Sequence, residues 1–301
     1  MNFISKIFDK FYLKQWSIGI VNEKIEDVIR NKNISKEIKW IQINNNYQFF
    51  ADPFIFESET GNYSILFEEM NYIKQYGIIS QFKLDNTNNA IEKKVILDTN
   101  THLSYPFIFY ENGNMYVFPE SSIRGKLSCY QYDSSSRSLQ FIRDLINLPL
   151  LDSTILKHQN KYWVFSTMKG IDSNKKLYIF YADNLFGTYT PHPQNPVKVN
   201  INGSRPAGNF ILLDGSIYRP AQGSGQYYGS SIIINKVIEL SESKFEEEYY
   251  FSITPPKEEY YNFGIHTINY VNNKIIIDGL VRRFLPFTQM KRYFLSSKKF
   301  S

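Results

Sequence analysis

The sequence has little cysteine and no long apolar run, and both scarcities narrow the classes of protein to consider. Only one cysteine, Cys129, occurs in 301 residues, which excludes an intramolecular disulfide framework. No Cys/His group has zinc-ligand spacing, so we predict no metal site. Nowhere do roughly 18 apolar residues run together as a spanning helix requires, and the first 30 residues lack the apolar core of a secretion signal. We therefore expect a protein of the reducing cytoplasm.

The main body of the chain also lacks a net positive charge, although the formal net charge of the whole chain is +5. Residues 1–16 sum to +2 and residues 282–301 to +6, with no acid in the second segment, so residues 17–281 sum to −3. Because binding to a phosphate backbone requires a basic stripe across the folded domain, we expect no nucleic-acid partner.

Aromatic residues are abundant, with 24 Phe and 23 Tyr contributing most of the 17% of Phe, Trp and Tyr. These residue types suit the pleated surface of a sheet better than a helix, so the composition favours an all-β class. All-β architectures of this length often form one domain. We therefore predict one domain over residues 1–301.

Five segments of the chain repeat the same order of features: a polar residue, an apolar strand, a Gly or Asn turn and a second apolar strand. The segments are ADPFIFESETGNYSILFEE from Ala51, SYPFIFYENGNMYVFPESS from Ser104, LDSTILKHQNKYWVFSTMK from Leu151, SRPAGNFILLDGSIYRPAQ from Ser204 and GIHTINYVNNKIIIDGLVRR from Gly264. Their polar positions are 53, 47, 53 and 61 residues apart, which matches one four-stranded propeller blade. The repeats predict a five-bladed β-propeller. A β-sandwich of hairpins is the alternative, but a sandwich has no reason to repeat this signature.

The last repeat contains only about two strands before the basic tail. We expect Trp16–Val21 to add a strand to that blade and to close the ring of blades, which would leave no free sheet edge.

A polar residue that is repeated at the start of each inner strand should converge at one mouth of the channel. The repeated residues are Asp52, Tyr105, Asp152, Arg205 and His266. Counting seven residues on from each hairpin Gly or Asn predicts a second ring, which consists of Glu68, Glu120, Thr167 and Gln222, with Asp278 as the fifth member. Any one acid could be a turn cap. As a set, these charges are too costly to bury for stability alone.

Carboxylates held across a sugar-binding cleft make and break glycosyl bonds, one as base or nucleophile and one as acid. We predict Asp52 as the base or nucleophile. Glu120 and Asp152 remain alternatives for the acid or for a group that stabilises the transition state. Arg205 is a candidate for a bidentate contact with a substrate phosphate or carboxylate. The predicted substrate-binding set is Glu68, His102, Tyr105, Thr167, Arg205, Arg219, Gln222, His266 and Asp278.

These motifs also resemble a known family. FFADPFIFE, HLSYPFIF, LDSTI, HPQNPV, SRPAG and YRPAQ, in that order over about residues 40–240, resemble the N-terminal-type domain of the plant glucosamine inositolphosphorylceramide transferases. Bacterial relatives that resemble this domain occur in surface-polysaccharide gene sets. In the plant proteins, a separate C-terminal domain resembles a glycosyltransferase.

The family is in turn similar to the five-bladed propeller glycosidases of the arabinanase and xylosidase type. That similarity implies that Asp52 matches the catalytic base, and that Glu120 and Asp152 match the other two carboxylates approximately. Tyr105 stands where those glycosidases usually have an Asp near this region. This departure puts a hydrolytic triad in doubt and favours transfer.

Both ends of the chain combine aromatic and basic residues. Residues 1–16 place Phe3, Ile4, Ile7, Phe8 and Phe11 at helical spacing with lysines on another face, which predicts a short amphipathic helix. This helix either packs on the propeller or, together with the basic aromatic tail at 282–301, contacts an anionic membrane surface.

We therefore expect an enzyme of surface-glycan biosynthesis, for capsule, O-antigen or glycolipid, in the cytoplasm and resting on the inner membrane face. It would transfer a glycosyl or related group onto a saccharide or glycolipid acceptor. We expect no cofactor, and a nucleotide sugar is the candidate donor. A propeller glycosidase and a non-catalytic glycan-binding propeller are the alternatives.

Overall fold

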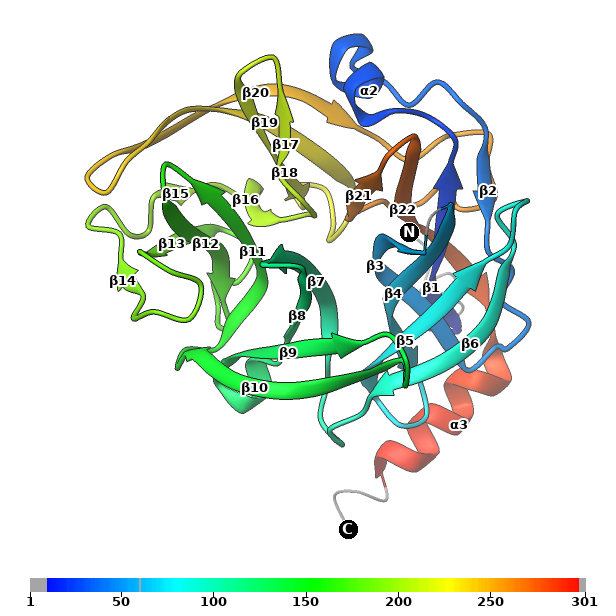
Figure 1. Cartoon of the computed structure of the whole chain (residues 1–301). Helices are drawn as coiled ribbons and strands as arrows, with labels where there is room; N and C mark the ends of the chain where they lie inside the picture. The colour runs from blue at the N-terminus through cyan, green and yellow to red at the C-terminus, as the bar shows by residue number, and fades with distance from the viewer. Residues whose placement is uncertain (1–9, 60, 298–301) are drawn as a thin grey trace.

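The computed structural model describes residues 10–59 and 61–297, which form five antiparallel sheets arranged around a central channel (Figure 1). The first blade contains β3 (Gln48–Glu59), β4 (Asn62–Asn71), β5 (Tyr76–Leu84) and β6 (Ala90–Leu97), and the second contains β7 (Ser104–Glu111), β8 (Asn114–Glu120), β9 (Leu127–Asp133) and β10 (Ser138–Ile146). The third contains β11 (Leu150–His158), β12 (Lys161–Met168), β13 (Lys176–Ala182) and the short strands β14 (Thr190–Pro191) and β15 (Lys198–Val199). The predicted five-bladed propeller is confirmed.

The fourth blade has an interrupted inner strand. It consists of β16 (Asn202–Pro206), β17 (Ile211–Leu213), β18 (Ser216–Gly223), β19 (Ser231–Leu240) and β20 (Phe245–Ile253). Both β16 and β17 pair with β18, so together they take the place of one inner strand.

The fifth blade joins the two ends of the chain. Its strands are β21 (Ile268–Val271), β22 (Lys274–Phe284), β1 (Tyr12–Val21) and β2 (Ile38–Trp40), in the order β2-β1-β22-β21. β1 pairs with β22 along its whole length, from Tyr12 opposite Phe284 to Val21 opposite Ile275. The predicted closing strand over Trp16–Val21 is therefore confirmed. It begins four residues earlier than expected.

The predicted N-terminal helix over residues 1–16 is wrong in its second half. Residues 12–16 belong to β1, because Leu13 and Trp16 are buried and the segment pairs with β22. Residues 1–9 lie outside the described part of the chain. The only α-helices among the described residues are α2 (Ile25–Asn31) and α3 (Pro286–Ser297). Neither described helix has the length and apolar character needed to span a membrane.

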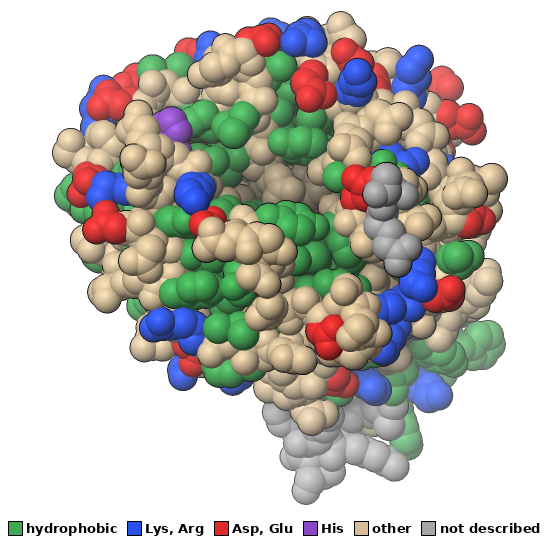
Figure 2. Space-filling model, viewed as in Figure 1, with side chains coloured by type: hydrophobic (Ala, Val, Ile, Leu, Met, Phe, Trp, Pro, Cys, Tyr) green, Lys and Arg blue, Asp and Glu red, His purple; other side chains and the backbone are tan. Residues whose placement is uncertain are grey.

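Buried apolar side chains fill the spaces between neighbouring blades. Inner strands bury both faces, as the apolar runs predicted: Phe54 and Phe56 pack towards the second blade, while Ile55 packs with Ile18 and Ile65 on the other side. At the hairpin end of the channel the blades leave a hollow of about 690 Å³, lined mainly by apolar residues that include Phe107, Phe210 and Tyr270. Figure 2 shows hydrophobic side chains gathered around a central hollow on one face of the molecule.

Candidate active site

The inner strands present their polar residues on a repeated β-bulge. In the first three blades, two residues of the inner strand stand opposite one residue of the next strand, and the first of these two is Asp52, Tyr105 or Asp152. All three have a left-handed backbone, with φ of 50°, 41° and 49°. Such a conformation costs on the order of 1–3 kcal/mol for a residue other than glycine and is concentrated at functional sites. Bulges re-aim side chains next to active sites, so this repeated strain singles out the predicted ring.

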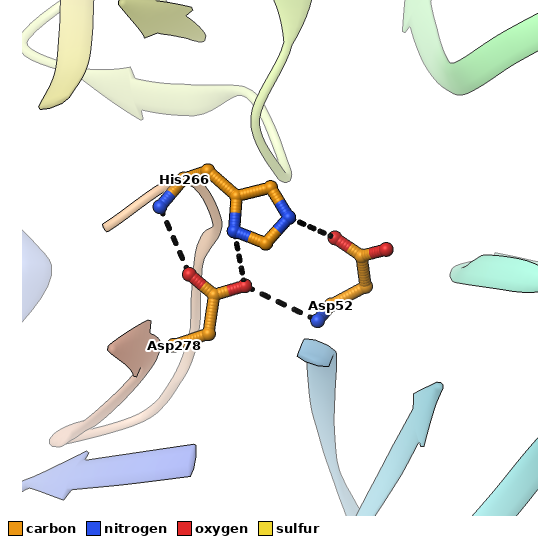
Figure 3. A group of neighbouring side chains, drawn as sticks. All are labelled: Asp52, His266 and Asp278. Atoms are coloured by element: carbon orange, nitrogen blue, oxygen red, sulfur yellow. Dashed lines mark hydrogen bonds and ion pairs between the residues drawn. The ribbon is translucent and has the colours of Figure 1, made fainter. Parts of the chain in front are cut away.

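Asp52, His266 and Asp278 form a buried acid–base cluster between the first and fifth blades (Figure 3). His266 Nε2 lies 3.2 Å from Asp52 Oδ1, and its Nδ1 lies 2.7 Å from Asp278 Oδ2. Asp278 also accepts hydrogen bonds from the backbone N–H groups of Asp52, His266 and Thr267 at 2.9–3.2 Å. The Thr267 hydroxyl donates to Asp52 Oδ1 at 2.8 Å. Each ring nitrogen of His266 therefore faces a carboxylate.

This cluster is electrostatically a buried imidazolium between two carboxylates. Burial alone would lower the pKa of His266, but Asp278 and Asp52 outweigh that effect and raise the pKa to about 10. His266 is consequently charged at neutral pH. The Trp16 ring packs against the imidazole at a tilt of 44°, with a centroid distance of 4.2 Å.

The same three residues are near enough to one another to share a metal ion. One ligand atom from each of Asp52, His266 and Asp278 lies within 4.8 Å of the others. However, both imidazole nitrogens already contact a carboxylate, so an ion would have to replace the imidazolium proton. The contacts of His266 with Asp52 and Asp278 therefore favour the ion-paired state of this cluster over a metal-bound one.

Asp152, Arg205 and Gln222 form the second half of the site, contributed by the third and fourth blades. Arg205 donates from Nε to Asp152 Oδ2 at 2.5 Å and from Nη2 to Oδ1 at 3.1 Å, a bidentate pair. Its Nη1 donates to Asn174 at 3.0 Å, and Gln222 Nε2 donates to Asp152 Oδ2 at 2.7 Å. All three guanidinium nitrogens thus have partners inside the protein. The predicted contact of Arg205 with a substrate phosphate would have to displace one of these partners.

Glu120 completes this half at the end of β8. Burial, reinforced by the Asp152 carboxylate and offset in part by Arg205, raises the pKa of Glu120 to about 8. Its Oε1 accepts a hydrogen bond from the Ser122 hydroxyl at 2.9 Å, whereas its buried Oε2 has no hydrogen-bond partner among the described residues and lies 3.5 Å from Arg205 Nη2. Glu120 therefore carries a proton at neutral pH, whereas both oxygens of Asp152 accept hydrogen bonds from Arg205 or Gln222.

Glu68 and His102 lie between the two halves. Burial raises the pKa of Glu68 well above its ordinary value, and the nearby charges of Asp52 and Glu120 add to this effect. His102 Nδ1 accepts the backbone N–H of Gly77 at 2.9 Å, and burial lowers the pKa of this imidazole. Its Nε2 is 3.9 Å from Glu68. Burial therefore favours the neutral form of both groups, and the His102 side chain is the more accessible of the two.

Tyr105 does not present its side chain at the mouth, contrary to prediction. The side chain is fully buried and crosses the channel, where its hydroxyl accepts the N–H of Gly208 at 2.7 Å and lies 2.8 Å from the Thr154 hydroxyl. Only its backbone N–H reaches the ring, at 3.3 Å from Asp52 Oδ2. The Tyr105 hydroxyl therefore bonds within the channel and is not presented at the ring.

Arg219 also departs from the predicted binding set, whereas Thr167 does not. Arg219 is three residues before Gln222 on β18, so the two side chains leave opposite faces of the strand. Its guanidinium is buried and forms a bidentate pair with Glu247, together with contacts to the carbonyls of Gly203 and Ser204. Thr167 is fully buried, and its hydroxyl has no hydrogen-bond partner among the described residues. Arg219 is therefore not brought to the ring. Thr167 pairs with Leu151 as Glu68 pairs with Ala51 and Glu120 with Ser104, so it has the predicted position in the second ring.

Sequence reasoning missed two residues that shape the ring, Tyr228 and Thr267. The Arg205 guanidinium lies 5.5 Å from the centroid of the Tyr228 ring, and Tyr228 also packs edge-on against His266 at 5.4 Å. Tyr228 therefore connects the two halves of the site. A Tyr-Gly pair after the YRPAQ motif was visible in the sequence, but nothing in the repeat pattern assigned it to the channel.

Comparison with known proteins places this site in context. Residues 36–267 match the family described as "Glucosamine inositolphosphorylceramide transferase 1, N-terminal". The chain is 35% identical over 206 residues to glucosamine inositolphosphorylceramide transferase 1 of Arabidopsis thaliana, and 30% identical over 206 residues to the protein of that name from Oryza sativa subsp. japonica. Each match covers 66% of this chain but 27% of the relative, so the chain spans about a quarter of the length of the curated relatives it matches.

Solved structures that are similar to this chain include glycosidases. Zg3597, a family 117 glycoside hydrolase of Zobellia galactanivorans, superposes with a TM-score of 0.56 at 13% identity, covering 92% of both chains. The exo-β-1,3-galactanase 1,3Gal43A of Clostridium thermocellum superposes with a TM-score of 0.54 at 13% identity, covering 79% of this chain and 57% of the other. At these identities the likeness establishes the fold alone.

Proposed function

This chain belongs to the family of the N-terminal domain of glucosamine inositolphosphorylceramide transferase 1, and from that premise we propose that its ring of carboxylates catalyses glycosyl transfer. The observation that carries the proposal is the pairing of opposite protonation states in one ring. Glu120 holds a proton at neutral pH, while Asp52 faces an imidazolium and is available as a base. Two carboxyl groups whose environments separate their roles are the pattern expected of an acid–base pair.

In the proposed reaction Asp52 accepts the proton of an acceptor hydroxyl, whose oxygen forms the new bond to the anomeric carbon. The bond from that carbon to the leaving oxygen breaks, and Glu120 donates its proton to that oxygen. Among the described residues, Asp52 Oδ2 accepts one long hydrogen bond, from the N–H of Tyr105, so this oxygen can still receive a proton. His266 and Asp278 orient Asp52, and Asp152 with Arg205 sets the charge around Glu120.

We infer the substrate classes from the family. The name of the relatives describes a transferase and contains glucosamine, an amino sugar, and inositolphosphorylceramide, a glycolipid component. We propose a saccharide or glycolipid acceptor, an activated sugar such as a nucleotide sugar as donor, and a role in surface-glycan biosynthesis at the cytoplasmic face of a membrane.

The experiment combines ligand screening with two matched variants. Purified protein is screened by thermal shift and saturation-transfer NMR against nucleotide sugars and oligosaccharides, and each pair that binds is assayed for transfer. Asp52→Asn should abolish transfer without unfolding the protein, while Asp214→Asn, in an exposed hairpin turn of the fourth blade, should have no effect. A fully active Asp52→Asn variant would remove Asp52 from the chemistry.

The same screen separates the other two functions. Release of free sugar from an oligosaccharide, with water as acceptor, would identify a glycosidase. Saccharide binding that persists in Asp52→Asn, with no turnover by either protein, would identify a glycan-binding propeller, a role compatible with the internal partners that the ring acids already have.

A further inference from the structure

Helix α3 turns large apolar side chains away from the propeller. Three of its exposed side chains are apolar: Phe287 is 83% exposed, Met290 59% and Phe294 63%. Their i, i+3, i+7 spacing places them on one side of the helix. The polar residues Thr288 and Gln289, in contrast, are buried. A helix that served only to cover the propeller would turn the apolar side inwards.

The apolar surface continues from α3 onto the end of the fifth blade. Phe284 is 47% exposed and Tyr12 is 40% exposed, and their ring centroids are 5.4 Å apart. We call the surface formed by Tyr12, Phe284, Phe287, Met290 and Phe294 the rim patch. Figure 1 shows α3 lying outside the five blades at the rim of the propeller. Contiguous exposed apolar surface of this kind marks an interaction site.

Positive charge surrounds the rim patch. The described residues of the two segments that form it, 10–22 and 282–297, contain the cations Lys10, Lys14, Arg282, Arg283, Lys291 and Arg292 and no acid. All of these cations except Arg283 are exposed. The guanidinium of Arg282 lies 5.2 Å from the centroid of the Tyr12 ring. Aromatic side chains ringed by lysine and arginine fit the boundary between acyl chains and anionic headgroups.

The rim patch lies at the end of the channel that carries the ring. Tyr12 precedes Trp16 by four residues on β1, which is about 13 Å along a strand. The Trp16 ring in turn packs against the ring of His266. A flat surface that contacts the rim patch would therefore lie close to the mouth where Asp52 and His266 are found.

We propose that the rim patch docks this protein on an anionic lipid membrane, with α3 lying in the interface. Docking holds the ring mouth beside the headgroups, where a lipid-linked saccharide would be presented. The choice of a lipid-linked substrate rests on the proposed function, whereas membrane docking does not.

The test is sedimentation of the protein with vesicles of phosphatidylcholine, with and without phosphatidylglycerol. Binding should require phosphatidylglycerol and fall with added salt. Phe287→Ser with Phe294→Ser should weaken binding at least tenfold. Lys291→Gln with Arg292→Gln should weaken it by about fivefold per charge removed.

Matched controls use the opposite end of the molecule and another surface. Lys24→Gln with Lys36→Gln removes two exposed charges near α2, and Ile171→Ser removes a fully exposed apolar side chain. Both controls should bind vesicles as the unchanged protein does. Asp52→Asn should also bind fully, so a failed transfer assay and a failed docking assay are distinguishable.

Two results would overturn membrane docking. One is binding to phosphatidylglycerol vesicles that the Phe287 and Phe294 changes leave intact. The other is the absence of vesicle binding. If the protein then self-associates in sedimentation velocity and the same changes abolish this self-association, the rim patch is an interface between copies of this chain.

Discussion

Glu120→Gln tests the electrostatics of the ring without knowledge of the substrate. The pKa of Glu120 is raised from 4.5 to about 8 in the folded protein. Between these two values the folded state binds a proton that the unfolded state has released, so stability falls as pH rises through this window. One proton corresponds to about 1.4 kcal/mol per pH unit, so the cost reaches up to about 3 kcal/mol at pH 7. Gln cannot ionise, and it can still accept the hydrogen bond from Ser122.

The assay is urea unfolding followed by circular dichroism at a series of pH values between about 5 and 8. The free energy of unfolding of the unchanged protein should decline across this range, and the slope for Glu120→Gln should be less steep by about one proton. Glu111→Gln is the matched control, because pairing with Lys157 lowers the pKa of Glu111 and such a shift acts below pH 4.5. Equal slopes for Glu120→Gln and the unchanged protein would refute a proton on Glu120, and with it the proposed acid.

One titration and two substitutions test other parts of the structure. His266 should titrate near pH 10 in imidazole NMR spectra, and a midpoint near 6.5 would contradict the ion pairs. Because the pKa of His266 is raised, the stability that the ion pairs contribute is full below about pH 6.5 and is lost as pH approaches 10. Arg219→Met should lower the free energy of unfolding by about 3–5 kcal/mol, since it leaves Glu247 buried without its main partner, and ligand binding by the folded fraction should not change. Tyr105→Phe should cost about 1–3 kcal/mol in urea unfolding, because the N–H of Gly208 loses its acceptor, and an unchanged stability would mean that the hydroxyl does not brace the channel.

The repeat pattern was sufficient to predict the fold and to bring most of the ring together. A polar residue recurring every 47 to 61 residues reflects the radial symmetry of the blades, so residues far apart in sequence, such as Asp52 and His266, could be placed side by side. The closing strand followed from the same symmetry, because a fifth blade with two strands needs partners. Both inferences depend on periodicity, which a single sequence displays directly.

The directions of individual side chains were beyond that reasoning. Tyr105 occupies the same bulge position as Asp52, with the same left-handed backbone, yet its longer side chain crosses the channel and binds the opposite blade. Arg219 was grouped with Gln222 because one motif contains both, although alternation along the strand separates their side chains. The helical spacing in residues 1–16 was real, but in residues 12–16 pairing with β22 overrode it.

The charge of the assembled ring supports chemistry at an anomeric carbon. Asp52, Asp152 and Asp278 each contact a cationic group, but only His266 and Arg205 supply positive charge among these contacts. With Glu120 protonated, the carboxylates of Asp52, Asp152 and Asp278 outnumber the two cations by one, and burial opposes a further charge on Glu68 because it raises the pKa of that group. A transition state with oxocarbenium character develops positive charge at the sugar, so a buried site with one excess negative charge stabilises it more than the neutral ground state. The raised pKa values of Glu68 and Glu120 limit the excess negative charge, since further buried anions are costly to desolvate.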